Sequence, residues 1–175
     1  LQLRDVTELA SKTEFKVFKD AIDSGGTVKA MRVPGGADKL SRKNTDALAE
    51  IAKTYGAGGL PTVKYQGGEF LTGVAKFVTP IKDELVEALG LEDGDIVMFG
   101  IGSYRVACTA LGEVRLALAQ ELELIPAGSF RGLWIVDFPM FEKDEVTGKI
   151  DFSHNPFSMP QGGMQALLEM DPLDI

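Results

Sequence analysis

Residues 96–101 (IVMFGI) are almost continuously apolar, and this run most constrains the fold that the chain can adopt. A strand without polar alternation is typical of a position covered on both faces of a sheet. A turn-rich segment precedes the run, and helical periodicity follows it over residues 104–121. We therefore expect a buried strand that leads into a long helix. Gly112 in that helix costs about 1 kcal/mol relative to alanine, so we expect close packing against a neighbour there.

The preceding residues give alternating strand and helix signals. Apolar–polar alternation or short apolar runs predict strands at residues 15–18, 27–33, 60–65 and 74–78. Helical spacing, with Ser41 and Thr79 as N-caps, predicts helices at residues 41–55 and 79–89. Paired strands that are each followed by a helix favour an α+β fold. We expect a two-layer sandwich of a largely antiparallel sheet with helices on one face, in a ββαββα-like order.

The pattern changes after residue 123. Residues 134–141 predict a strand of a different, larger sheet, and residues 163–170 predict the start of a helix. We interpret the two ends of the chain as parts of one domain that the sandwich interrupts. The expected limits are residues 1–13 and 124–175 for the interrupted domain and residues 14–123 for the inserted one.

Charge and composition limit the classes of function. The formal net charge of −8 argues against an independent nucleic-acid-binding domain, because phosphate contacts are made by Lys and Arg. One local basic cluster, Lys29, Arg32, Lys39, Arg42 and Lys43, is either a solvated turn or a contact for a polyanion. The single cysteine, Cys108, cannot form an intrachain disulfide, and a reducing compartment fits. The sequence has no apolar run of about 18–20 residues and no signal-peptide pattern, so we expect no membrane partner.

The segment of residues 153–160 (SHNPFSMP) holds the only histidine of the chain. His154 can offer a donor and an acceptor, and Asn155 offers both without charge, so the pair suits recognition of a carboxylate or an amino group. The alternative is a turn whose polar groups cap the next element. One histidine and no cysteine pair give no metal site. The sequence also lacks a nucleophile elbow and a phosphate-binding loop, so we expect no catalytic residue.

A series of ordered segments resembles one known family along essentially the whole chain. The segments are residues 30–37 (AMRVPGGA), 40–43 (LSRK), 52–60 (AKTYGAGGL), 75–77 (AKF), 93–95 (DGD), 110–116 (ALGEVRL), 133–142 (LWIVDFPMFE) and 154–158 (HNPFS). Together they resemble the bacterial-type aspartyl-tRNA synthetases.

The resemblance implies that residues 14–123 are the insertion domain that these synthetases share with the B subunit of the tRNA-dependent amidotransferase. The flanking residues then belong to a class II catalytic domain. The family activates aspartate with ATP and Mg²⁺, transfers it to tRNA, and works as a cytoplasmic homodimer. His154 matches the family histidine that contacts aspartate, and Asn155 stands where many members have a second histidine.

The same resemblance implies a role for the inserted domain as a scaffold or as a contact for the tRNA acceptor end. For such a contact we expect Arg32, Lys39, Arg42 and Lys43. The rest of the family's active site matches nothing here, so we expect the chain alone neither to bind ATP and Mg²⁺ nor to activate aspartate. The alternatives are a non-catalytic binding module, as in the amidotransferase subunit, and a scaffold without a ligand.

Overall fold

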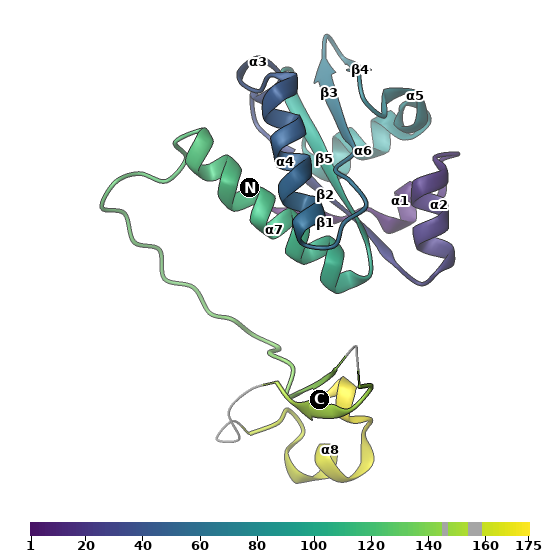
Figure 1. Ribbon diagram of the computed structural model, residues 1–175, viewed down its shortest axis with the longest axis vertical. Coiled ribbons are helices and arrows are strands. Elements are labelled where there is room, and N and C mark those ends of the chain that lie inside the picture. Colours follow the sequence, from purple (N-terminus) through teal and green to yellow (C-terminus); the bar gives the residue numbers. More distant parts are fainter. Residues whose placement is uncertain (145–146, 154–158) are drawn as a thin grey trace. The chain divides into compact units, whose positions relative to one another are not determined.

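A five-stranded sheet in the order β1-β2-β5-β3-β4 organises the first part of the chain (Figure 1). Each neighbouring pair of its strands is antiparallel. The computed structural model describes residues 1–144, 147–153 and 159–175. The chain divides into two compact units, Leu1–Ala127 (unit 1) and Gly128–Ile175 (unit 2). Unit 1 confirms the α+β class with an antiparallel sheet.

The strands of unit 1 are β1 (Leu3–Asp5), β2 (Thr27–Val33), β3 (Thr62–Gln66), β4 (Glu69–Leu71) and β5 (Asp95–Gly102). Its helices are α1 (Thr7–Ser11), α2 (Lys16–Asp23), α3 (Gly36–Lys39), α4 (Arg42–Thr54), α5 (Ala75–Val78), the 3₁₀ turn η1 (Thr79–Ile81), α6 (Lys82–Leu89) and α7 (Tyr104–Glu121). The predicted strand at residues 27–33 and the predicted helix at residues 104–121 are confirmed with their limits. Helix α4 is also confirmed, with Ser41 and Asn44 forming its capping box.

Strand β5 lies at the centre of the sheet, between β2 and β3. Its register pairs Val97 with Arg32 of β2 and with Val63 of β3. Seven of its eight residues are buried, as the continuous apolar run predicts. The strand therefore has both edges paired and both faces covered.

The helices cover both faces of the sheet rather than the one face that we expected. On one face, Val97, Phe99 and Ile101 of β5 pack against a cluster that includes Phe18 and Leu85. On the other, Ile96 and Met98 pack against a second cluster that includes Leu48, Leu111 and Leu118. The first face is thus covered by α1, α2, α5 and α6, and the second by α3, α4 and α7 (Figure 1). The physical reason is that a strand apolar on both sides needs two layers of helices to exclude water.

The predicted strand at residues 15–18 is wrong, because these residues begin helix α2. Phe15, Phe18 and Ile22 all pack against the first cluster, and their spacing is that of one helix face. Phe18 is fully buried, with its ring 4.9 Å from the ring of Phe15. A window of four residues cannot distinguish strand alternation from the first turn of a helix.

The predicted strand at residues 74–78 is also wrong. The strand that pairs back onto β3 is β4, at Glu69–Leu71, and Ala75–Val78 form helix α5. Strand β4 pairs with β3 through a two-residue loop in which Gly67 and Gly68 have positive φ angles of 61° and 77°. This is the turn type that matches the twist of a hairpin. Thr72 and Gly73 then take left-handed conformations, which end the strand and lead into α5.

The limits of the compact units differ from the expected domain limits. Strand β1 pairs with β2, with Leu3 opposite Met31, and Val6 and Ala10 are buried in the first cluster. Residues 1–13 therefore pack within unit 1. This unit extends to Ala127 rather than to residue 123. The assignment of both flanks to a catalytic domain stays a prediction.

Unit 2 contains the hairpin of β6 (Phe141–Lys143) and β7 (Ile150–Phe152), helix α8 (Gly163–Glu169) and the 3₁₀ turn η2 (Pro172–Asp174). The rings of Phe141 and Phe152 lie 4.9 Å apart across the hairpin. The backbone N–H of Met140 donates to the carbonyl of Ile175 at 2.9 Å. The helix predicted from residue 163 is confirmed.

The strand predicted for residues 134–141 is wrong except for its last residue, where β6 begins. Leu133, Trp134, Ile135 and Val136 have no regular structure, and each is more than 70% exposed. The segment finds no neighbouring strand among the described residues of unit 2, and strands are stable only when their backbone groups are paired. The side chain of Trp134 is 92% exposed.

Two glycines, Gly100 of β5 and Gly112 of α7, differ in how closely other atoms surround them. A methyl group at Gly100 of β5 would lie 2.6 Å from Leu111 Cγ and 2.8 Å from the carbonyl oxygen of Ala107. Gly100 therefore sets the separation of α7 from β5. The close packing that we expected at Gly112 is absent, because a methyl group there would meet nothing within 4 Å.

We predict opposite effects for alanine at these two glycines. Gly100→Ala should lower the free energy of unfolding by about 1–3 kcal/mol, because the core must move apart. Gly112→Ala, the matched control in the facing helix, should raise it by about 0.5–1 kcal/mol through helix propensity. Urea unfolding followed by far-UV circular dichroism measures both. A neutral Gly100→Ala would contradict the close approach.

Candidate functional site

Four features bear on function. They are the predicted aspartate contacts His154 and Asn155, a pocket in unit 2, the predicted basic cluster, and the buried carboxylate of Asp95, which binds Arg32 of that cluster. His154 and Asn155 lie outside the described residues. The chain on their N-terminal side is fixed by Ser153, whose backbone N–H donates to the carbonyl of Met140 at 3.0 Å. The Ser153 hydroxyl also donates to the carbonyl of Pro139.

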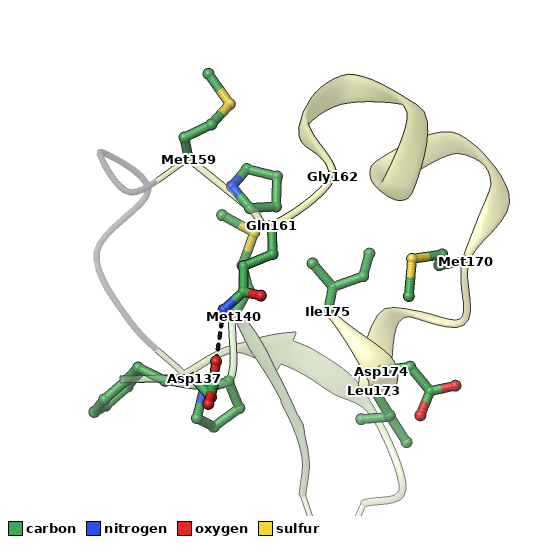
Figure 2. Close-up of a pocket in the computed structure, with 12 residues that line it drawn as sticks. Asp137, Met140, Met159, Gln161, Gly162, Met170, Leu173, Asp174 and Ile175 are labelled. Atoms are coloured by element: carbon green, nitrogen blue, oxygen red, sulfur yellow. Dashed lines mark hydrogen bonds between the residues drawn. The ribbon is translucent and has the colours of Figure 1, made fainter. Parts of the chain in front are cut away.

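Unit 2 contains a pocket of about 700 Å³ (Figure 2). Three methionines, Met140, Met159 and Met170, contribute apolar walls. The side chains of Asp137 and Gln161 add a polar patch, in which Gln161 Nε2 donates to Asp137 Oδ1 at 2.7 Å (Figure 2). A carboxylate beside an amide can bind a small ligand that carries a cationic or donor group. Met159, which lines the pocket, follows the predicted pair by only a few residues in the sequence.

The structure separates Arg32 from the other predicted basic residues. Arg32 Nε lies 2.6 Å from Oδ2 of Asp95, a carboxylate that is 2% exposed, and a terminal nitrogen of Arg32 lies 3.0 Å from Glu92. Arg32 also donates to the carbonyl of Gly90. This guanidinium is therefore occupied by internal partners, and its first role is structural.

Asp95 is the partner that the sequence analysis did not find. Besides Arg32, it accepts hydrogen bonds from the backbone N–H groups of Gly35, at 3.0 Å, and Glu92, at 2.8 Å. One carboxylate thus fixes β2 and two turns at the start of β5. A charged residue directly before a continuous apolar run was the available signal, because a buried charge must be paired.

Lys39, Arg42 and Lys43 form an exposed basic corner where α3 meets α4. Arg42 has a weak ion pair with Asp46, with 3.9 Å between nitrogen and oxygen and both side chains largely exposed. In the part of the chain that the structure describes, Lys39 and Lys43 have no carboxylate within ion-pairing distance. We call these three residues the basic corner.

Lys29, the remaining member of the cluster, is bound by Asp5 of the edge strand β1. Its Nζ lies 2.7 Å from Asp5 Oδ2 and 4.8 Å from the centroid of the Tyr104 ring. Partial burial raises the pKa of the Asp5 carboxyl, but hydrogen bonds from Lys29 and Thr7 outweigh it and lower this pKa from 3.8 to about 2. The pair is therefore ionised at neutral pH and is not available to a ligand.

Two other kinds of site are absent from residues 1–144, 147–153 and 159–175. No group of three or more His, Cys, Asp or Glu side chains is placed to hold a metal ion. No described helix has the length and hydropathy needed to cross a membrane.

Residues 18–111 match the family model of the GAD domain. This match covers β2, β3, β4 and β5 completely, together with most of α2 and part of α7. The chain belongs to the GAD domain family. The match confirms the predicted α+β domain as a GAD domain, and its insertion into a catalytic domain stays a prediction.

Similarity to known proteins extends over both units of the chain. The chain is 47% identical over 169 residues to the aspartate–tRNA ligase of Streptococcus agalactiae serotype Ia, and 41% identical over 175 residues to that of Enterococcus faecalis. The ligase of Streptococcus pneumoniae serotype 19F is 46% identical over 169 residues. These alignments cover 97–100% of this chain but only 28–30% of each relative. The chain thus spans less than a third of the length of these relatives.

The ion pairs of the two arginines in the predicted basic cluster, Arg32 with Asp95 and Arg42 with Asp46, should contribute differently to the free energy of unfolding. Asp95→Ala removes the acceptor of three donors and leaves Arg32 with only Glu92 and the carbonyl of Gly90, so we expect a loss of about 3 kcal/mol in the free energy of unfolding of unit 1. Arg42→Ala removes an exposed pair and should cost about 0.5 kcal/mol or less.

Far-UV circular dichroism during urea unfolding measures this difference. The fluorescence of Trp134, the only tryptophan, should not change in either variant, because this side chain belongs to unit 2 and is 92% exposed. Equal losses for the two variants would show that the Asp95 network contributes no more than a surface pair.

Proposed function

We propose that the chain is part of an aspartate–tRNA ligase, the enzyme that activates aspartate with ATP and Mg²⁺ and transfers it to tRNA. The observation that carries this proposal is the 41–47% identity to such ligases along 97–100% of the chain. In this proposal the GAD domain, residues 14–123, is inserted into a catalytic domain to which residues 1–13 and 124–175 belong. The complete ligase would act in the cytoplasm as a homodimer.

Unit 2 would supply part of the aspartate site. His154 and Asn155 are the proposed contacts, since their side chains can donate to a carboxylate. The polar patch of Asp137 and Gln161 lies in the same unit and offers an acceptor for an ammonium group. Charge stabilisation of the reacting phosphates would come from residues outside this chain.

The full-length ligase tests this proposal through aspartate-dependent ATP–pyrophosphate exchange. His154→Ala should raise the KM for aspartate by about tenfold, because one hydrogen bond to a charged ligand group is lost. The dissociation constant for tRNA should not change, and Asn155→His is the conservative comparison. Exchange with an unaltered KM for aspartate would remove His154 from the site, and no exchange in the unmodified ligase would refute the proposed activity.

A non-catalytic module, as in the amidotransferase B subunit, is the second candidate. The match of residues 18–111 to the GAD domain alone is compatible with it. The aspartate–tRNA ligases of Streptococcus agalactiae and Enterococcus faecalis, however, align over residues of both units. The proposal of a ligase therefore explains more of the chain.

The basic corner is the proposed tRNA contact of the GAD domain. Lys39, Arg42 and Lys43 are exposed and lie within five residues of one another. Arg32, which the sequence analysis grouped with them, is held by Asp95, so we expect it to support the fold that presents the corner. Such a contact would bind phosphates without reading the sequence of the RNA.

Reversing these three charges should weaken tRNA binding without affecting adenylate formation. For Lys39→Glu, Arg42→Glu and Lys43→Glu combined, we expect the dissociation constant to rise by about tenfold or more and the salt dependence of binding to fall. Filter binding at several salt concentrations measures both. Lys16→Glu on α2, an exposed lysine on the other face of the sheet, is the control. An unchanged dissociation constant for tRNA in the triple variant would refute the proposed contact.

A further inference from the structure

A groove of about 440 Å³ lies on unit 1 between the first residues of the chain and helix α7. Leu1 to Arg4 line it on one side, and Cys108, Gly112 and Arg115 line it on the other. These three helix residues are spaced by four and three positions, so they lie on one face of α7. The groove is open to solvent and is distinct from the basic corner.

Gly112 keeps this groove open at a cost to the helix. Glycine in the middle of a helix is about 1 kcal/mol less favourable than alanine, and no neighbour within 4 Å requires it here. The absence of a side chain instead allows a ligand to approach the helix backbone closely, which is a recurrent use of glycine.

Two guanidinium groups line the groove without an acidic partner. Arg4 and Arg115 are both exposed, and no carboxylate of the described residues lies within ion-pairing distance of either one. The nearest acid along β1, Asp5, is already bound to Lys29. The groove therefore carries a local positive charge on a chain whose net charge is −8.

The edge of β1 adds backbone donors to these charges. The N–H of Val6 donates to the carbonyl of Val28, so residue 6 directs its backbone groups toward β2. Pairs alternate in an antiparallel ladder, and Leu3 therefore directs its N–H toward the open edge. Guanidinium groups together with free backbone N–H groups are the donors that bind phosphate oxygens.

The groove is also connected to the basic corner through α7. Asn44, in the capping box of α4, donates from Nδ2 to Oε1 of Glu121 at 2.6 Å, which holds the start of α4 beside the end of α7. Arg115 lies six residues before Glu121, or about 9 Å along the helix axis.

We propose that the groove between β1 and α7 is a second phosphate-contacting site of the GAD domain, which binds the RNA backbone through Arg115 and Arg4. This inference rests on the proposed function, because that function supplies tRNA as the partner. It adds a contact surface on the opposite side of α7 from α4. Gly112 provides the space, and Arg115 provides the charge.

Binding of tRNA to the full-length ligase tests the groove. Arg115→Glu and Gly112→Glu should each raise the dissociation constant for tRNA by about threefold to tenfold and reduce the salt dependence by about one ion. Gly112→Ala adds a methyl group without charge, so it should raise the dissociation constant less than Gly112→Glu does. Lys16→Glu controls for the change in net charge. Unchanged affinity in both glutamate variants, with normal circular dichroism, would overturn the proposal.

Cys108 provides a second measurement that needs no substitution. It is the only cysteine of this chain and lines the groove, so bound RNA should slow its alkylation by iodoacetamide, as followed by peptide mass spectrometry. Inorganic phosphate and pyrophosphate should protect it far less. Equal rates of alkylation with and without saturating tRNA would overturn the proposal. Protection by pyrophosphate but not by tRNA would also overturn it and would indicate a small anion as the ligand of the groove.

The exchange assay keeps the two proposals separable. If the ligase forms aspartyl-adenylate but the groove variants bind tRNA as the unmodified protein does, the groove is refuted and the activity stands. If exchange is absent but Arg115→Glu still weakens tRNA binding, the activity is refuted and the RNA contact stands.

Discussion

The burial of β5 on both faces is the constraint on which unit 1 depends. Its apolar residues alternate between two hydrophobic clusters, so the sheet needs helices on both sides. Its edges pair with β2 and β3, which fixes the register of the strands that carry the surrounding helices. Gly100 then allows α7 to approach closely enough to close the second layer. The basic corner and the groove both lie on elements of this second layer.

A single buried carboxylate decides how the basic residues are used. Asp95 holds Arg32 and two backbone N–H groups at the start of β5, so a residue that resembles a ligand contact in the sequence is part of the structure instead. Lys29 is similarly bound to Asp5. The basic corner and Arg115 remain exposed, so their charges are available to a polyanion.

The proposed function divides the chemistry between the two units. Unit 2 would contribute to recognition of aspartate through the segment that contains His154, and the GAD domain would contact RNA by charge and shape alone. Such a division explains why an acidic chain can carry an RNA contact, since only the local arrangement of guanidinium and ammonium groups matters.

The sequence by itself determined the central strand 96–101, strand 27–33, the helices α4 and α7, the Ser41 cap of α4 and the family resemblance, because these depend on local periodicity, capping and ordered motifs. The predicted cap at Thr79 is wrong, because Thr79 lies inside η1 and its hydroxyl donates to the carbonyl of Ala75. Short windows misled at residues 15–18 and 74–78, where helix and strand patterns coincide. Only the tertiary structure decided that helices cover both faces, that Arg32 is bound by Asp95, and that Gly112 lines a groove. These features depend on contacts between residues far apart in the sequence, and no local pattern records which partners folding brings together.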